Sequence, residues 1–171
     1  MDLSALKALS LAINLAHNDP TVVKHLAEWK DYAWTQMRLS NCSGSTACVV
    51  PRQRWDWHRK QWVDFAFQTD RGKTIVTLTL TDDDPTDDDF VCVTAAFLDF
   101  DSNPLFVFHQ NWHASPGEVI SHTFSISAPA GAASPHSVAV GSKQCRNGPL
   151  EDDDVYRKSL KRLRQPPPQP L

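Results

Sequence analysis

The sequence of 171 residues lacks the signatures that most readily assign a function. It has no run of about 20 apolar residues, so we expect no membrane span. Its net charge of −3 argues against a strongly basic protein that binds nucleic acid. There is no HExxH or CxxC metal motif, no GxSxG nucleophile, no phosphate loop and no dinucleotide fingerprint. These absences predict a protein that is not an enzyme and that carries no cofactor, apart from the calcium considered below.

The N-terminal residues do not resemble a secretory signal, because the start is acidic and Lys7 interrupts the apolar run. A cytoplasmic location with reduced thiols is therefore the prediction. Cys42 and Cys48 flank a short loop and would form a disulfide only in an oxidising compartment. Cys92 alternates within an apolar run, as a small buried side chain does, and Cys145 has no evident partner.

Residues 1–40 predict a helical hairpin packed on a sheet. Apolar residues recur at helical spacing over 3–17. Asp19 and Pro20 then suit the N-cap and the first position of a second helix. The apolar stripe of that second helix consists of Val22, Leu26, Trp29, Ala33 and Met37.

Residues 46–142 predict an antiparallel β-sandwich of about seven strands, because short β-rich runs alternate with turn signals. The clearest runs are 73–81, 90–98, 104–112 and 118–126. The run 90–98 is apolar on both faces, so it should be a central strand that is covered on both sides. Alternation also places Val63, Phe65 and Phe67 on one face of a strand, and Trp62, Asp64 and Ala66 on the other.

The C-terminal part predicts a short helix and a tail. Residues 151–165 form an amphipathic pattern whose acidic start and basic end complement the helix dipole. Residues 166–171 are rich in proline and are predicted to be flexible. With the two preceding segments, this gives an α+β fold class: an N-terminal helical hairpin, a β-sandwich and a C-terminal helix.

Within residues 73–127, two turn motifs suggest a family. Phe97-Leu-Asp99 ends one predicted strand, and Pro116-Gly-Glu118 opens another that ends in an aromatic residue. This layout resembles the FxLYD-like group of small bacterial immunoglobulin-like modules, with Asn103 in place of the turn glycine. The resemblance implies an immunoglobulin-like sandwich that serves as a non-enzymatic binding or spacer module.

The stretch from Arg52 to Trp62 interleaves cations with three tryptophans. Such clusters anchor protein partners or stack on sugars and bases. Alternatively, the tryptophans pack in the core and the cations face solvent. The candidate binding residues are Arg54, Trp55, Trp57, Arg59 and Trp62.

Six aspartates crowd the loop 82–89. Calcium takes six to eight oxygen ligands, so a calcium site is one interpretation of this loop. The other is a solvated hairpin loop that keeps a sheet edge from pairing with other chains. The candidate metal ligands are Asp82, Asp84, Asp87 and Asp89.

Three histidines are candidates for a zinc site with a partner elsewhere in the chain. His109 and His113 are about 13 Å apart on a strand at roughly 3.3 Å per residue, too far to share one ion. His122 shares an apolar strand face, which favours a core position.

The sequence as a whole predicts a non-catalytic module that recognises a macromolecule, most simply a protein partner, or that self-associates through its helical hairpin. Two alternatives stay open. One is a calcium-binding sandwich module, and the other is a small enzyme whose site is assembled only in three dimensions.

Overall fold

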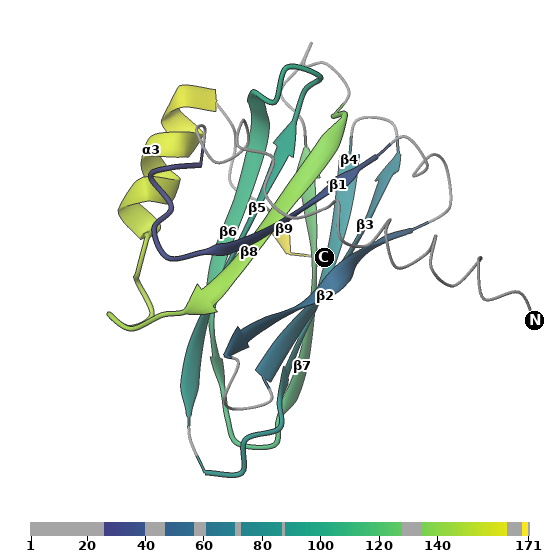
Figure 1. Ribbon diagram of the computed structural model, residues 1–171. Coiled ribbons are helices and arrows are strands. Elements are labelled where there is room, and N and C mark those ends of the chain that lie inside the picture. Colours follow the sequence, from purple (N-terminus) through teal and green to yellow (C-terminus); the bar gives the residue numbers. More distant parts are fainter. Residues whose placement is uncertain are drawn as a thin grey trace, which may run out of the picture.

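Two antiparallel sheets stack over a shared apolar core in this computed structural model, the layout of a β-sandwich (Figure 1). The structure describes residues 26–39, 47–56, 61–70, 73–86, 88–127, 135–163 and 169–170. The four-stranded sheet has the order β1 (Ala33–Arg38), β8 (Ser137–Gln144), β5 (Asp89–Leu98) and β6 (Pro104–Ala114). The five-stranded sheet has the order β2 (Cys48–Asp56), β3 (Gln61–Asp70), β4 (Lys73–Asp82), β7 (Val119–Ser127) and β9 (Gln169–Pro170).

The core follows from period-two alternation in both sheets. Val63, Phe65 and Phe67 point inward from β3 and are buried, as their shared face predicted. Aromatic rings tie the two sheets together, since Phe67 lies edge-on to Phe97 at 5.6 Å between ring centroids. Phe97 in turn stacks on Phe106 at 4.3 Å.

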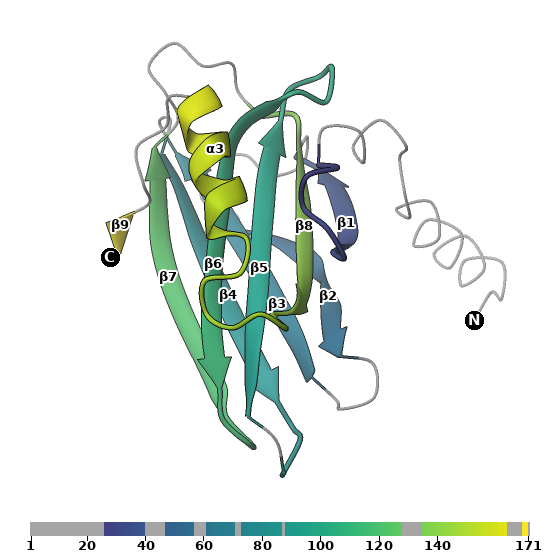
Figure 2. The same ribbon diagram turned by 90° about the vertical axis from the view of Figure 1, so that its left-hand side faces the viewer.

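The predicted central strand is confirmed, because β5 lies between β8 and β6 and is buried on both faces. Its outer face is covered by helix α3 (Asp153–Leu163) and by residues 26–32. Figure 2 shows α3 lying over this sheet. A second apolar cluster forms there, in which Leu26 and Trp29 pack with Ala96, Leu98, Val107 and Ala139.

The predicted N-terminal helical hairpin is wrong, and with it the α+β fold class, because the described chain is mostly β with a single helix, α3. Residues 33–38 form strand β1, which pairs with β8 from Ala33–Ser142 to Arg38–Ser137. Hydrogen bonding of this segment to the edge of β8 determines its conformation more strongly than the helical spacing of its apolar residues does. The turn before β1 ends at Asp31, which has a φ of 67°. The first predicted helix, 3–17, lies outside the described residues.

The cysteines also differ from expectation. Cys92 and Cys145 form a disulfide with a Cα–Cα distance of 5.4 Å, so the prediction of reduced thiols is wrong for this pair. The bond joins β5 to the loop that follows β8. Cys48 is disulfide-bonded as well, to a residue outside the described ranges.

The C-terminal helix is confirmed within 151–165, and its acidic first turn and basic last turn are as predicted. Gln169 and Pro170, in the tail predicted to be flexible, pair with Ser125 and Phe124 of β7. The β5–β6 turn differs in one detail, since the positive φ of 64° falls on Ser102 while Asn103 bonds to the Asp99 carboxylate. Within the described ranges, no helix has the length and hydropathy needed to cross a membrane.

Candidate functional site

The outer face of the five-stranded sheet carries the exposed side chains considered first as a site. No helix of the described chain lies over it, in contrast to the opposite sheet under α3 (Figure 1). Side-chain hydroxyl groups lie in the middle of this face. The hydroxyl oxygens of Thr79 and Ser121 are 3.1 Å apart, a hydrogen-bond distance. Thr77 and Thr123 pair in the same way at 3.5 Å.

One end of this face carries an arginine, a tryptophan and an aspartate. Arg52 donates two hydrogen bonds to the Asp64 carboxylate, at 2.7 and 2.6 Å. Its guanidinium also lies 5.1 Å from the ring centroid of Trp62, a cation–π distance. The hydrogen bond to Asp64 raises the pKa of Arg52. The Arg52 side chain remains 54% exposed, so this planar group is available to a partner.

Aliphatic side chains flank these polar groups. Val49 on β2 and Val119 on β7 are 67% and 63% exposed, and Ile75 on β4 is 36% exposed. A flat sheet face with scattered apolar contacts and one ordered arginine matches the composition of protein–protein interfaces better than that of a small-molecule cleft.

The structure tests the predicted tryptophan–arginine cluster only in part. Trp62 and Asp64 share one face of β3, as alternation predicted, and the structure shows that this is the outer face. Arg54 lies opposite Trp62 in the β2–β3 pairing, but the side chains of Arg54 and Trp55 lie outside what the structure describes. Trp57 and Arg59 lie outside the described residues altogether.

The cation found on Trp62 is Arg52, which sequence reasoning did not select. The register of β2 against β3 shifts between Val50 and Gln53, so simple alternation along β2 misassigns its faces. The available signal was the opposite charge of Arg52 and Asp64, since alternation had already placed Asp64 on the same strand face as Trp62.

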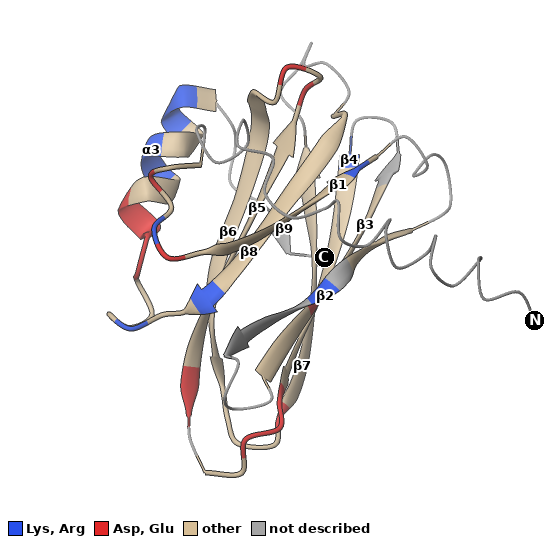
Figure 3. Ribbon diagram, in the orientation of Figure 1, with Lys and Arg blue, Asp and Glu red and all other residues tan. Residues whose placement is uncertain are grey.

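The acidic loop is less exposed at its ends than its composition suggests. Figure 3 colours the acidic residues of the chain red. Asp82, the last residue of β4, and Asp89, the first of β5, are buried, whereas Asp83 and Asp88 are exposed. The Asp84 carboxylate is hydrogen-bonded within the loop, because it accepts bonds from the backbone N–H and the hydroxyl of Thr86 at 2.9 and 2.7 Å. Position 87 lies outside the described residues.

A buried amide links the two ends of that loop. Gln61 Nε2 donates to Asp82 Oδ1 at 2.9 Å and to Asp89 Oδ2 at 2.5 Å. Gln144 donates to the second oxygen of Asp89, and the backbone N–H of Asp84 donates to Asp82 at 2.9 Å. Burial raises the pKa of Asp82, against the opposing effect of the Gln61 hydrogen bond. No sequence motif marks Gln61, so its part in this cluster was missed.

A second buried polar cluster lies under the loop before α3. Lys143 bonds to Glu151 at 2.8 Å and to Asp152 at 2.7 Å, and it also donates to the carbonyl of Lys30 at 3.0 Å. The ring of Tyr32 lies 4.9 Å from the Lys143 ammonium, and its hydroxyl donates to Asp152 at 3.2 Å. One ammonium group thus bonds to two carboxylates and to a backbone carbonyl, so the cluster fastens the loop to the sheet.

His109 belongs to the same covered face. Its Nδ1 lies 2.8 Å from the Thr94 hydroxyl, and its Nε2 lies 3.2 Å from the Glu151 carbonyl. Burial lowers the pKa of His109, and burial raises the pKa of neighbouring Tyr156 to about 12. Both groups are therefore neutral at neutral pH, and packing against Trp29 closes the histidine from solvent.

The other two candidate zinc ligands, His113 and His122, lie apart from His109. His113 is exposed and lies 3.6 Å from Asp88. His122 is half-buried and stacks on Trp112 at 5.4 Å, close to the predicted core position. Across the described residues, no three His, Cys, Asp or Glu side chains converge in a way that could hold a metal.

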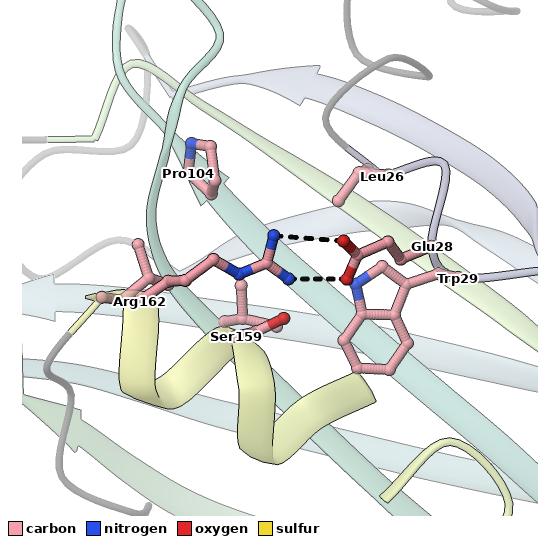
Figure 4. A pocket seen from close by; sticks show the side chains of 8 residues that line it. Leu26, Glu28, Trp29, Pro104, Ser159 and Arg162 are labelled. Atoms are coloured by element: carbon pink, nitrogen blue, oxygen red, sulfur yellow. Dashed lines mark hydrogen bonds and ion pairs between the residues drawn. The ribbon is translucent and has the colours of Figure 1, made fainter. Parts of the chain in front are cut away.

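A small pocket opens between α3 and residues 26–29 (Figure 4). Its volume is about 120 Å³, below the roughly 300 Å³ at which ligand clefts begin. The bidentate pair of Arg162 with Glu28, at 2.6 and 3.2 Å, lies on its wall. It is a crevice in helix packing rather than a substrate site.

Comparison with known proteins adds no function. No protein-family model matches the chain, and no curated protein matches it. The Salmonella enterica trimeric lipoprotein SadB is similar in structure over 88% of this chain and 74% of its own, at 9% identity and a TM-score of 0.35. The enzymatically active domain of the bacteriophage CBA120 tailspike protein 4 is similar over 67% of this chain and 17% of its own, at 11% identity and a TM-score of 0.25. Both likenesses are too distant to support an argument.

Proposed function

We propose that this chain is a non-catalytic recognition domain that binds a protein partner through the outer face of its five-stranded sheet. The observation that supports this most is the difference between the two outer faces. One is covered by the protein's own helix, whereas the other presents Arg52, Trp62 and exposed aliphatic side chains. Arginine and tryptophan are the residues most often found at the energetic centre of protein interfaces.

The enzyme alternative has less support. A catalytic site needs a pocket that holds a substrate next to a titratable group. The pocket beside α3 is small, and the buried groups with shifted pKa values under the loop, His109 and Tyr156, are enclosed by packing. The open face offers a flat surface instead.

The disulfide bears on where the domain works. Disulfides form and persist mainly in oxidising compartments. The Cys92–Cys145 bond therefore favours a location outside the reducing cytoplasm, against the location predicted from the N-terminal residues. Alkylation of the protein isolated from its own cells, followed by mass spectrometry, measures whether these thiols are blocked.

The test of the proposed function uses paired surface variants. Ile75→Lys and Val119→Lys change exposed residues of the open face, so we expect little loss of stability. Phe100→Lys and Leu150→Lys are matched controls, because these side chains are 80% and 74% exposed on loops away from that face.

The measurement is quantitative affinity capture from cells of the source organism, compared between wild type and the four variants. We expect a partner that the open-face variants lose and the loop variants retain. Equal retention by all variants would overturn the proposed surface. Sedimentation of the purified protein separates a second copy of this chain from a different partner, since a self-assembled species appears without any lysate.

A further inference from the structure

The two edges of the five-stranded sheet differ in how well they are protected from another strand. Strand β2 forms one edge, where Pro51 lacks a backbone N–H and the register against β3 shifts at two places. Irregularities of this kind keep an edge from pairing with other chains. Strand β7 forms the other edge, apart from the short β9 that pairs with part of it.

Strand β7 carries none of these protective features. It contains no Lys, Arg, Asp, Glu, Pro or Gly, and its pairing with β4 runs along the whole strand without a register shift. Within the described ranges, its outer edge is paired only with β9, at Phe124 and Ser125 (Figure 2). Residues 119–123 therefore present an open, uncharged and regular strand edge, the kind to which another strand can add.

Burial along β7 decreases where β9 ends. Phe124 and Ser125, which pair with β9, are 8% and 7% exposed. Ile120 and His122 share the inward face with Phe124, and His122 stacks on Trp112 of the core, yet both are only half-buried. The core is thus incompletely covered along the same stretch whose backbone edge is open.

We propose that this open edge pairs with the same edge of a second copy of the chain, so that two β7 strands run antiparallel about a two-fold axis. Symmetry about the middle of the open stretch places Ser121 opposite its own copy, with Val119 opposite Thr123 and Ile120 opposite His122. A pairing of about five residues is an ordinary strand length. It ends where β9 begins, so β9 keeps its place.

A second copy fits this edge because β7 is complementary to itself. Neither strand brings a formal charge, so no like charges meet across the axis. The two Ser121 hydroxyls meet on the outer face, in the way that Ser121 already meets Thr79 of β4 at 3.1 Å. On the inner face, Ile120 of one copy covers the open part of His122 of the other, which removes apolar surface from water.

This dimer leaves the proposed binding face open, so the inference does not depend on the proposed function. Arg52 of β2 and Trp62 of β3 lie toward the opposite edge of the sheet from β7. Joining two sheets edge to edge would present two copies of that face side by side.

The experiment is sedimentation velocity of the purified full chain at rising protein concentration. The wild type should pass reversibly from monomer to dimer and stop there, because the pairing uses up the open edge of each copy. A single strand pairing makes a small interface, so the dimer should dissociate on dilution. A wild type that stays monomeric at every concentration, or that assembles beyond a dimer, would overturn the proposal.

Two variants of one exposed residue assign the interface. Ser121→Lys and Ser121→Glu each place two like charges opposite one another at the axis, so each variant alone should be monomeric. An equimolar mixture of the two should form a heterodimer, because the charges that meet are then opposite. Recovery in the mixture also shows that both variants are folded at this edge.

The matched control is Ile75→Lys, which adds the same charge to the outer face of β4 rather than to the edge. It should dimerise like the wild type even where it loses the partner of the open face, which separates the two proposals. A dimer that survives in both Ser121 variants, or that is lost equally in Ile75→Lys, would place the contact elsewhere and contradict edge pairing.

Discussion

The two outer faces of this sandwich differ in whether the protein's own chain covers them. On the four-stranded sheet, Lys143 is matched with Glu151 and Asp152 and sealed under the loop that leads to α3. On the five-stranded sheet, the Arg52–Asp64 pair makes equally short bonds but stays open to water. The same kind of interaction therefore fastens the chain to itself on one face and remains available on the other, which is the physical reason to look for a partner on the second face.

The largest expected effect comes from breaking the sealed face. Lys143→Met removes the cation but leaves the buried carboxylates of Glu151 and Asp152 without their partner. Removing one member of a buried pair costs about 3–5 kcal/mol. Urea unfolding should therefore show a midpoint far below that of the wild type.

The control for this comparison is Lys158→Met on the outer side of α3. Lys158 reaches Asp154 at 3.4 Å, and both side chains are about two-thirds exposed. Exposed ion pairs on a helix contribute little to stability because water screens them, so this variant should unfold almost like the wild type. Similar losses in the two variants would show that the sealed network has no special role.

The strands that alternate were predictable, because their faces depend only on local spacing. Val76, Leu78 and Leu80 are fully buried on β4, as period two requires. Strand β1 was not predictable in this way, since its apolar residues also fit a helix. What decides its structure is pairing with β8, such as Thr35 with Val140, about a hundred residues along the chain.

In the candidate sites too, features set by local spacing were predictable, whereas features set by long-range strand pairing were not. Alternation placed Trp62 and Asp64 on the same strand face, but the register shift in β2 that brings Arg52 to them is invisible in the sequence. For Asp82 and Asp89, sequence reasoning offered calcium ligands or solvated loop residues, and neither interpretation predicted that both side chains are buried. Their burial depends on Gln61 and Gln144, which come from two other strands.

The disulfide gives the next largest effect on the covered face. The double variant Cys92→Ser/Cys145→Ser opens a cross-link between residues 53 apart in the sequence. Losing such a bond costs about 2–4 kcal/mol. Urea unfolding of the variant without reductant isolates this bond, whereas reductant on the wild type would also act on the disulfide at Cys48. A variant as stable as the wild type would contradict the importance of this link.

Gly141→Ala tests how tightly β1 is packed on β8. A Cβ atom at this position would lie 2.8 Å from the ring of Trp34, which lies flat against the glycine. Overpacking of this kind costs about 1–3 kcal/mol, measured by urea unfolding. The double variant with Trp34→Leu should recover part of the loss, and an unchanged deficit would place the clash elsewhere.

Acid should weaken the covered face. Burial lowers the pKa of His109 below its usual 6.5, so the unfolded chain takes up a proton first and stability falls as the pH drops below that value. Burial opposes the shift at Glu151, but hydrogen bonds from Lys143 and Asn147 lower its pKa below 4.5. Its contribution is present above pH 4.5 and is lost as the pH falls further. Urea midpoints from pH 7 to 4 should decline, and His109→Gln should flatten the upper part of that decline; an unchanged slope in this variant would rule out His109 as its source.

The smallest effect on stability is expected for the ion pair of the open face. Measuring it gives the most direct comparison between the open and the covered face. A double-mutant cycle of Arg52→Ala and Asp64→Ala should give only a small coupling energy, because both side chains are solvated and water screens their attraction. The same cycle on Lys143 and Glu151 should give several times more, since that pair is buried. An Arg52–Asp64 coupling as large as that of the buried pair would mean that the pair stabilises the fold. Loss of binding in a variant of this face could then not be separated from loss of structure. A small coupling leaves Arg52 free to exchange its water for a partner.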